Sequence, residues 1–143
     1  MIIADTGFWV GLLFRRDTHH PRAALAYARW KGQLVTTWPI LTESCYLLGS
    51  RVDPEAAAAL LELAGTAFDV WELPSTASTR AASLMRQYQA LPMDLADASA
   101  VLLAEHQKDG RILSTDRRDF NAYRWKDRQP FQNLLFEDPA AGA

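Results

Sequence analysis

The stretch 94–116, DLADASAVLLAEHQKDGRILSTD, decides the fold that the sequence predicts. Residues 94–108 favour a helix that is almost wholly apolar after an acidic first turn, and a helix that is apolar on all sides belongs in a protein core. The Asp-Gly pair that follows favours a turn, and residues 111–115 favour a strand that ends at Asp116. A core helix that leads directly into a strand is typical of the repeating unit of a parallel sheet.

The rest of the chain shows the same alternation of strands and helices. The predicted strands there are 2–5, 34–37 and 68–73, and the predicted helices are 7–14, 21–31, 40–48, 54–64 and 75–89. This order predicts an α/β fold with a mostly parallel sheet and helices on both of its faces. Ligands of such sheets bind beyond the carboxyl ends of strands, which is where Asp5 and Asp116 stand.

The length and composition favour one globular domain. The chain has 143 residues, close to the commonest domain size, and is 49% hydrophobic against 22% charged. We expect a single domain over residues 1–138. Residues 139–143 are short and rich in alanine, so we expect a flexible tail there.

The sequence also favours a cytoplasmic protein without a membrane anchor. Its single cysteine, Cys45, excludes an intrachain disulfide. The apolar start of the chain has no basic leader region, carries Asp5 within the apolar run, and reaches Arg15 and Arg16 too early for a membrane span.

The charge pattern contains one feature against a nucleic-acid partner and one in favour of it. A net charge of −2 provides no overall basic field. However, only three of the 15 basic residues are lysines, and the guanidinium group of arginine suits bidentate phosphate contacts. A GC-rich genome would also enrich arginine, so both interpretations stay open at this point.

Four acidic residues occupy positions beside apolar segments, where an acidic side chain calls for an explanation. Asp5 and Asp116 end strands, Glu43 lies among apolar helix residues, and Asp97 begins the core helix. Two carboxylates about 4 Å apart repel by about 4 kcal/mol at an effective dielectric constant of about 20, so such a cluster should take up protons or bind a cation. Mg²⁺ or Mn²⁺, which prefer oxygen ligands, would resolve the repulsion and could activate water for phosphodiester hydrolysis.

Residues beside these four acids are further candidates. Asp94 shares a helix face with Asp97, and we favour Asp94 as the helix cap over Asp94 as a second metal ligand. Asp119 could be a ligand, but capping of a helical turn or pairing with an arginine is an equally good interpretation. Three polar neighbours of Asp116 are candidates for RNA phosphate contacts, namely Thr115, Arg117 and Arg118.

Four blocks of the sequence resemble the PIN-domain family, and specifically its short members of the VapC toxin type. The blocks are IIADTGFWVGLL, LTESCYLL, LPMDLADASAVLLAE and ILSTDRRDF, in the family's order and spacing over nearly the whole chain. By this resemblance Asp5, Glu43, Asp97 and Asp116 match the family's four acids. Asp94 is an additional acid that many relatives lack.

The resemblance implies properties that composition and spacing do not show. These are a three-layer αβα sandwich, endoribonuclease activity that depends on Mg²⁺ or Mn²⁺, frequent homodimers, and neutralisation by a small antitoxin protein. We further expect such a partner to bind an exposed apolar helix surface near the acids, with Trp9 and Trp30 as candidate contacts.

Other classes of protein remain to be weighed. A haloacid-dehalogenase-like enzyme needs a second aspartate two residues after the first, where this chain has Gly7. A receiver domain needs a lysine at the end of a late strand, and Lys108 and Lys126 are poorly placed for that role. The alternative that stays open is a non-catalytic binding module whose acidic pocket holds a structural ion or an arginine of a partner.

Overall fold

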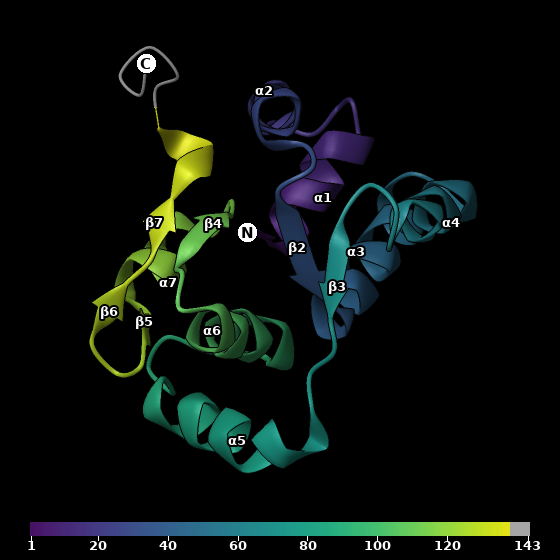
Figure 1. The fold of residues 1–143 in the computed structure, drawn as a ribbon. Coiled ribbons are helices and arrows are strands. Elements are labelled where there is room, and N and C mark those ends of the chain that lie inside the picture. Colours follow the sequence, from purple (N-terminus) through teal and green to yellow (C-terminus); the bar gives the residue numbers. More distant parts are fainter. Residues whose placement is uncertain (138–143) are drawn as a thin grey trace.

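A sheet of five parallel strands forms the centre of the computed structural model, which describes residues 1–137. The strand order is β3-β2-β1-β4-β7 (Figure 1). The strands are β1 (Ile2–Ala4), β2 (Leu34–Thr37), β3 (Asp69–Trp71), β4 (Arg111–Leu113) and β7 (Gln132–Asn133). The parallel sheet predicted from the sequence is confirmed. The tail predicted at residues 139–143 lies outside the described residues.

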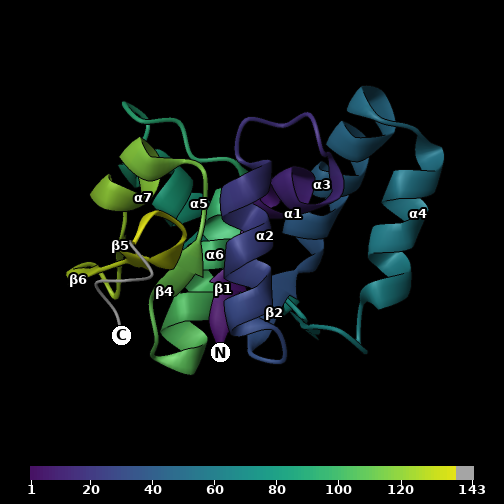
Figure 2. The same ribbon diagram turned by 90° about the horizontal axis from the view of Figure 1, so that it is seen from above.

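Helices cover both faces of this sheet and complete three layers (Figures 1 and 2). Figure 1 shows α1 and α2 on one face and α6, with α5 outside it, on the other, while α3 and α4 stand together beside the β3 edge. The helices are α1 (Thr6–Leu13), α2 (His20–Trp30), α3 (Trp38–Arg51), α4 (Pro54–Leu63), α5 (Ser78–Gln87), α6 (Leu95–Gln107) and α7 (Arg117–Ala122). Short pieces complete the fold: the 3₁₀ helices η1 (Ser75–Ala77) and η2 (Leu134–Phe136), and the hairpin of β5 (Arg124–Trp125) and β6 (Gln129–Pro130).

Helix α6 is the core helix that its sequence predicts. Every residue from 98 to 104 is buried. Helix α3 and helix α5 pack against α6, which also contacts β1 and β2. Because only small and apolar side chains fill this stretch, α6 can be enclosed by the sheet and by two helices without burying an unpaired charge.

The register of β1 against β4 brings the ends of the two strands together at the carboxyl edge of the sheet. Ile3 pairs with Ile112 and Ala4 with Leu113, so both strands end at the same level. The backbone N–H of Asp5 then donates to the carbonyl of Leu113 at 3.0 Å. The residue that follows β1 is therefore fixed beside the residue that follows β4.

The structure departs from the predicted elements in places where local patterns are weak. The helix predicted from Ser75 begins as η1 and becomes α-helical only at Ser78. Two apolar side chains of the predicted helices 54–64 and 75–89 lie at the surface, since Leu61 and Met85 are 45% and 37% exposed. The strands β5, β6 and β7 were not predicted, since two residues are too few to show an alternation.

The tryptophan side chains divide between core and surface. Trp9 is fully buried, contacts Phe8 and Phe68, and directs its indole N–H toward the Thr36 hydroxyl at 3.5 Å. The expectation that Trp9 contacts a partner protein is therefore wrong, because its side chain has no accessible surface. Trp38, in contrast, is 43% exposed. Within residues 1–137 we find no helix long and apolar enough to cross a membrane.

Candidate metal centre

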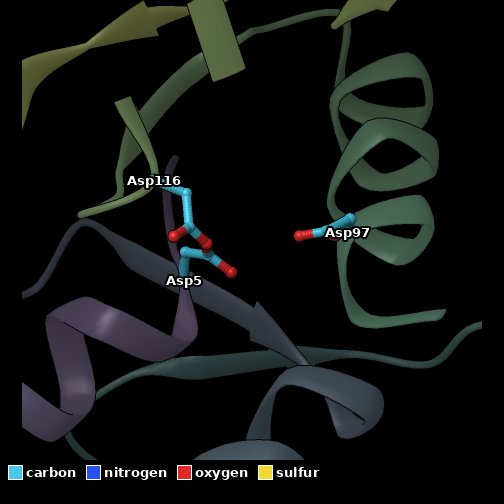
Figure 3. Close-up of side chains that lie close together, drawn as sticks. All are labelled: Asp5, Asp97 and Asp116. Atoms are coloured by element: carbon cyan, nitrogen blue, oxygen red, sulfur yellow. The ribbon is translucent and has the colours of Figure 1, made fainter. Parts of the chain in front are cut away.

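Three of the four predicted acids meet at the carboxyl edge of the sheet (Figure 3). Asp5 follows β1, Asp116 follows β4, and Asp97 lies in the first turn of α6. One carboxylate oxygen from each lies within 4.8 Å of the other two. Figure 3 shows the three side chains pointing toward a common point from three different elements.

Asp5 is the most deeply buried member of this acidic triad. Its side chain is 2% exposed, and the hydroxyl of Ser114 donates to its Oδ2 at 2.8 Å. Burial raises the pKa of Asp5 to about 7, against the hydrogen bond from Ser114, and the negative charge of Asp116 contributes to the rise. A carboxyl group in this state binds a proton near neutral pH unless a cation replaces it.

Asp97 is a member of the triad and also of a capping box at the start of α6. The Asp94 side chain accepts from the backbone N–H of Asp97 at 2.9 Å, and Asp97 Oδ2 accepts from the backbone N–H of Asp94 at 3.2 Å. Asp94 is thus the helix cap, as expected. Burial, followed by the charges of Asp5 and Asp94, raises the pKa of Asp97. The reciprocal cap fixes the direction in which the Asp97 carboxylate faces.

Asp116 is the accessible member of the triad. Burial of its carboxyl group raises its pKa, and the charges of Asp119 and Asp94 raise it further. Asp119 is therefore close enough to act on Asp116. Among residues 1–137 the Asp119 carboxylate neither caps a helix nor pairs with an arginine, so both structural interpretations of this residue are wrong.

Glu43, the fourth predicted acid, lies beside the triad rather than within it. It comes from α3, and the set of oxygens that share the 4.8 Å limit does not include it. Burial and the neighbouring Asp94 raise its pKa, while the Thr6 hydroxyl lowers it. Thr6 Oγ1 is buried next to this carboxylate and has no hydrogen-bond partner among the described residues.

Ser114 connects the two acidic residues that follow β1 and β4. Its hydroxyl donates to Asp5 and accepts from the backbone N–H of Asp116 at 3.0 Å. Thr115 instead packs against Gly7, where an added Cβ would lie 1.7 Å from the threonine Oγ1. A glycine at position 7 is therefore required for the close approach of α1 to this segment.

Two further positioning residues carry no signal in the sequence. The Asn133 side chain donates from Nδ2 to the Ser114 carbonyl at 2.8 Å and accepts from the Ser114 N–H at 3.2 Å. The buried Tyr123 hydroxyl lies within hydrogen-bond distance of the Leu91 and Pro92 carbonyls, at 3.3 and 3.2 Å. Tyr123 thereby ties α7 to the loop that precedes Asp94. Both contacts depend on segments that meet only in the folded chain.

The donor set fits a hard divalent cation. Two oxygens on opposite sides of one Mg²⁺ lie about 4.2 Å apart, twice the usual bond length, so the triad oxygens, which lie within 4.8 Å of one another, would draw closer together around a shared ion. Within residues 1–137 no ion pair involves Asp5, Asp97 or Asp116, and burial together with neighbouring acids raises their pKa values. The unpaired Thr6 hydroxyl adds a neutral oxygen at the margin of the same site.

A family model described as "PIN domain" matches residues 2–126. The chain belongs to the PIN-domain family. A curated relative, "Ribonuclease VapC26" of Mycobacterium tuberculosis, is 36% identical to this PIN domain over 124 residues, which are 86% of this chain and 92% of the relative.

A solved structure supports the fold of this PIN domain independently. The crystal structure of VapC20, titled a "Sarcin-Ricin loop cleaving toxin" from Mycobacterium tuberculosis, superposes with a TM-score of 0.75 at 22% identity. The match covers 82% of this chain and 91% of VapC20. The three-layer αβα sandwich implied by the resemblance is thereby confirmed for this PIN domain.

Proposed function

We propose that this PIN domain is a metal-dependent endoribonuclease, and that it is the toxin of a type II toxin–antitoxin pair. The observation that carries the proposal is the triad of Asp5, Asp97 and Asp116, three carboxylates at the carboxyl edge of the sheet that form no ion pair within the described part of the chain. Membership of the PIN-domain family and a relative named as a ribonuclease support the same activity.

The geometry supports the following proposed roles for the chain's own residues. Asp5, Asp97 and Asp116 hold the cation, Mg²⁺ or Mn²⁺, and Glu43 is the fourth acid beside it. A divalent cation at such a site supplies an activated water and neutralises charge on the phosphate during hydrolysis. Ser114 keeps Asp5 and the Asp116 backbone in register, so the ligands are in place before substrate arrives.

The substrate and partners belong to the same proposal. Thr115, Arg117 and Arg118 stand beside Asp116 and are the proposed contacts to RNA phosphates. A homodimer in the cytoplasm and a small cognate antitoxin complete the assignment, on the strength of the VapC names among the similar proteins. Asp94 and Asp119 are proposed as possible additional metal ligands beside the triad.

A cleavage assay tests this function directly. Purified protein would be incubated with total RNA and with a ribosomal RNA hairpin that carries the sarcin–ricin loop, with Mg²⁺, with Mn²⁺, or with EDTA. We expect cleavage in the metal-containing reactions alone. Metal binding by calorimetry with no cleavage of any RNA would instead favour the non-catalytic binding module.

A further inference from the structure

A polar hollow opens on the surface next to the acidic triad. It has a volume of about 470 Å³ and is lined by residues of α7 and of the segment that contains β7 and η2. Its wall includes Arg117, Arg118, Asn133, Phe136 and Glu137. Phe136 and Glu137 also line a second, larger hollow that is formed with α2.

Phe136 separates the two hollows and holds an arginine toward each. The guanidinium carbon of Arg117 lies 4.3 Å from the centre of the Phe136 ring, and that of Arg22 lies 5.0 Å from it. Arg22 Nη1 also donates to the Leu135 carbonyl at 3.4 Å. A guanidinium held against an aromatic ring keeps the N–H donors at its edge free for a bidentate partner such as phosphate.

These arginines are not engaged by acidic side chains within residues 1–137. The ion pairs there use the amino terminus, Arg80 and Arg111 as cations. Glu137, the acid that lines the hollow, accepts from the Gln132 side chain at 2.8 Å. The guanidinium groups therefore present positive charge beside an acidic site that would otherwise repel an anionic substrate.

The hollow is joined to the triad through short connections. Arg117 and Arg118 follow Asp116 directly in the chain. Asn133, at the wall of the hollow, is hydrogen-bonded to Ser114, whose hydroxyl binds Asp5. A polynucleotide with one phosphate at the triad would therefore have Arg117 and Arg118 close to a neighbouring phosphate.

We propose that this hollow, together with Arg22 of the neighbouring hollow, forms a subsite for the phosphate backbone of single-stranded RNA next to the bond that is cut. Arg22 and Arg117 bind phosphate, Arg118 adds charge at the wall, and Phe136 is the positioning residue that fixes both stacked guanidiniums. This subsite rests on the proposed ribonuclease function and extends it to residues of α2 and η2.

The test measures RNA affinity separately from cleavage. A fluorescein-labelled RNA of 12 nucleotides and random sequence would be titrated with the full chain in EDTA, at several salt concentrations, and followed by anisotropy. The variants are Arg22→Gln, Arg117→Gln and Phe136→Leu. The control matched to Arg22→Gln is Arg29→Gln, which removes one positive charge from the same helix. The guanidinium carbon of Arg29 also lies against an aromatic ring, 4.6 Å from the centre of Trp30. Arg29 lies two turns further along α2, near the end of the helix that leads into β2, and it lines the larger hollow as Arg22 does.

We expect Arg22→Gln and Arg117→Gln each to weaken binding by about 5- to 10-fold. Each should also lower the slope of log affinity against log salt by about 0.7, the value for one phosphate contact on a single strand. Phe136→Leu should weaken binding about 2- to 3-fold without any change in net charge, since the two arginines lose their support. Arg29→Gln should bind as the unmodified protein does.

Three results would overturn the subsite. The first is equal weakening by Arg22→Gln and Arg29→Gln, which would mean that net charge alone matters. The second is unchanged affinity in both Arg22→Gln and Arg117→Gln, two exposed substitutions that leave the fold intact by thermal melting. If the unmodified protein still cleaves RNA with Mg²⁺ in that case, only the subsite fails. An unmodified protein that neither binds nor cleaves any RNA is the third, and it defeats the proposed function as well.

Discussion

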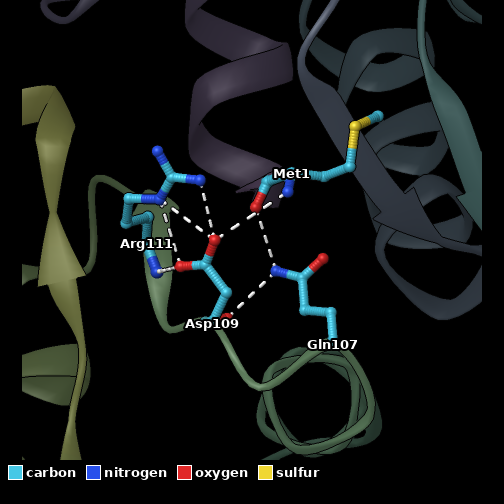
Figure 4. A network of polar contacts seen from close by, with 4 residues as sticks. All are labelled: Met1, Gln107, Asp109 and Arg111. Atoms are coloured by element: carbon cyan, nitrogen blue, oxygen red, sulfur yellow. Dashed lines mark hydrogen bonds and ion pairs between the residues drawn. The ribbon is translucent and has the colours of Figure 1, made fainter.

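The acidic residues at the two ends of strands β1 and β4 differ in whether basic groups pair with them. At the amino edge, Asp109 lies 2.7 Å from the Arg111 guanidinium and 3.8 Å from the amino terminus, while Gln107 donates to the Met1 and Asp109 carbonyls (Figure 4). At the carboxyl edge, Asp5, Asp97 and Asp116 face one another (Figure 3), and among residues 1–137 no basic side chain forms an ion pair with them.

The pKa values record this difference. Burial alone would raise the pKa of Asp109, but the hydrogen bonds and charge of Arg111 outweigh it and hold the pKa below its usual value. Burial and mutual repulsion raise the pKa of Asp5 and of Asp97. An acid with its partners in place stabilises a fold, whereas a buried cluster without them lowers stability and is retained for a ligand. This difference supports a structural role for the amino edge and the proposed functional role for the carboxyl edge.

The largest effect should come from removing one carboxylate at each edge and measuring RNA cleavage. Asp97→Asn keeps an oxygen for the helix cap but loses a charged ligand, and we expect cleavage to fall by about 1000-fold or more, since a metal ion contributes several kcal/mol to such a reaction. Asp109→Asn should cleave at the unmodified rate. Equal activity of the two variants would remove the functional distinction between the edges.

The next effect concerns how stability depends on pH in the absence of metal. The pKa of Asp5 is raised from about 4 to about 7, so its folded form binds more protons and stability falls as the pH rises through that window. A shift of this size corresponds to about 4 kcal/mol at most, at 1.36 kcal/mol per pKa unit. Urea unfolding at pH 4.5 and pH 8 should show this loss in the unmodified protein and a smaller one in Asp5→Asn.

At the amino edge, the contribution of Asp109 to stability depends on pH in the opposite direction. The pKa of Asp109 is lowered, so its contribution is present above its unfolded value and is lost as the pH falls through the folded value. Asp109→Asn should therefore lose stability at pH 8 and leave the slope between pH 4.5 and pH 8 no shallower than in the unmodified protein. If Asp109→Asn reduced the dependence of unfolding free energy on pH and Asp5→Asn did not, the pH dependence would come from the amino edge, contrary to this prediction.

Divalent metal should stabilise the protein through the carboxyl edge alone. At about 100 times the dissociation constant, binding to the folded state adds about 2.7 kcal/mol, which for a domain of this size raises the melting temperature by about 5–10 °C. Thermal melts with Mn²⁺ or Mg²⁺ should show this rise in the unmodified protein and in Asp109→Asn, and little or none in Asp97→Asn. The same rise in all three proteins would mean that the triad is not the metal site.

The smallest effect is that of the structural ion pair itself. Arg111 is 38% exposed in its pair with Asp109, and ion pairs of such exposure contribute about 1 kcal/mol or less. Arg111→Gln should therefore lower the free energy of unfolding by no more than that amount at neutral pH, and the loss should shrink in high salt. A loss of several kcal/mol in urea unfolding would show that the amino edge matters more to the fold than its exposure implies.

Much of the fold could be predicted from the sequence, because local patterns carry it. The alternation of short apolar strands with longer helices specifies a parallel sheet, and the apolar run of α6 identifies the helix that the sheet and its neighbours enclose. The four acids could be singled out for the same reason, since charged residues at the ends of buried strands and at the start of a core helix are conspicuous against apolar neighbours.

What the sequence alone determined was therefore the fold class and the chemical type of the site. Only the tertiary structure decided that Asp5, Asp97 and Asp116 share one point while Glu43 stands aside, because that outcome depends on the register of β1 against β4 and on the placement of α6. The same holds for the Ser114 bridge and for the two arginines on Phe136. These contacts join segments that lie far apart in the chain, such as α2 and η2. Local propensity carries no record of such pairings, since they form only when separate elements pack against the same sheet.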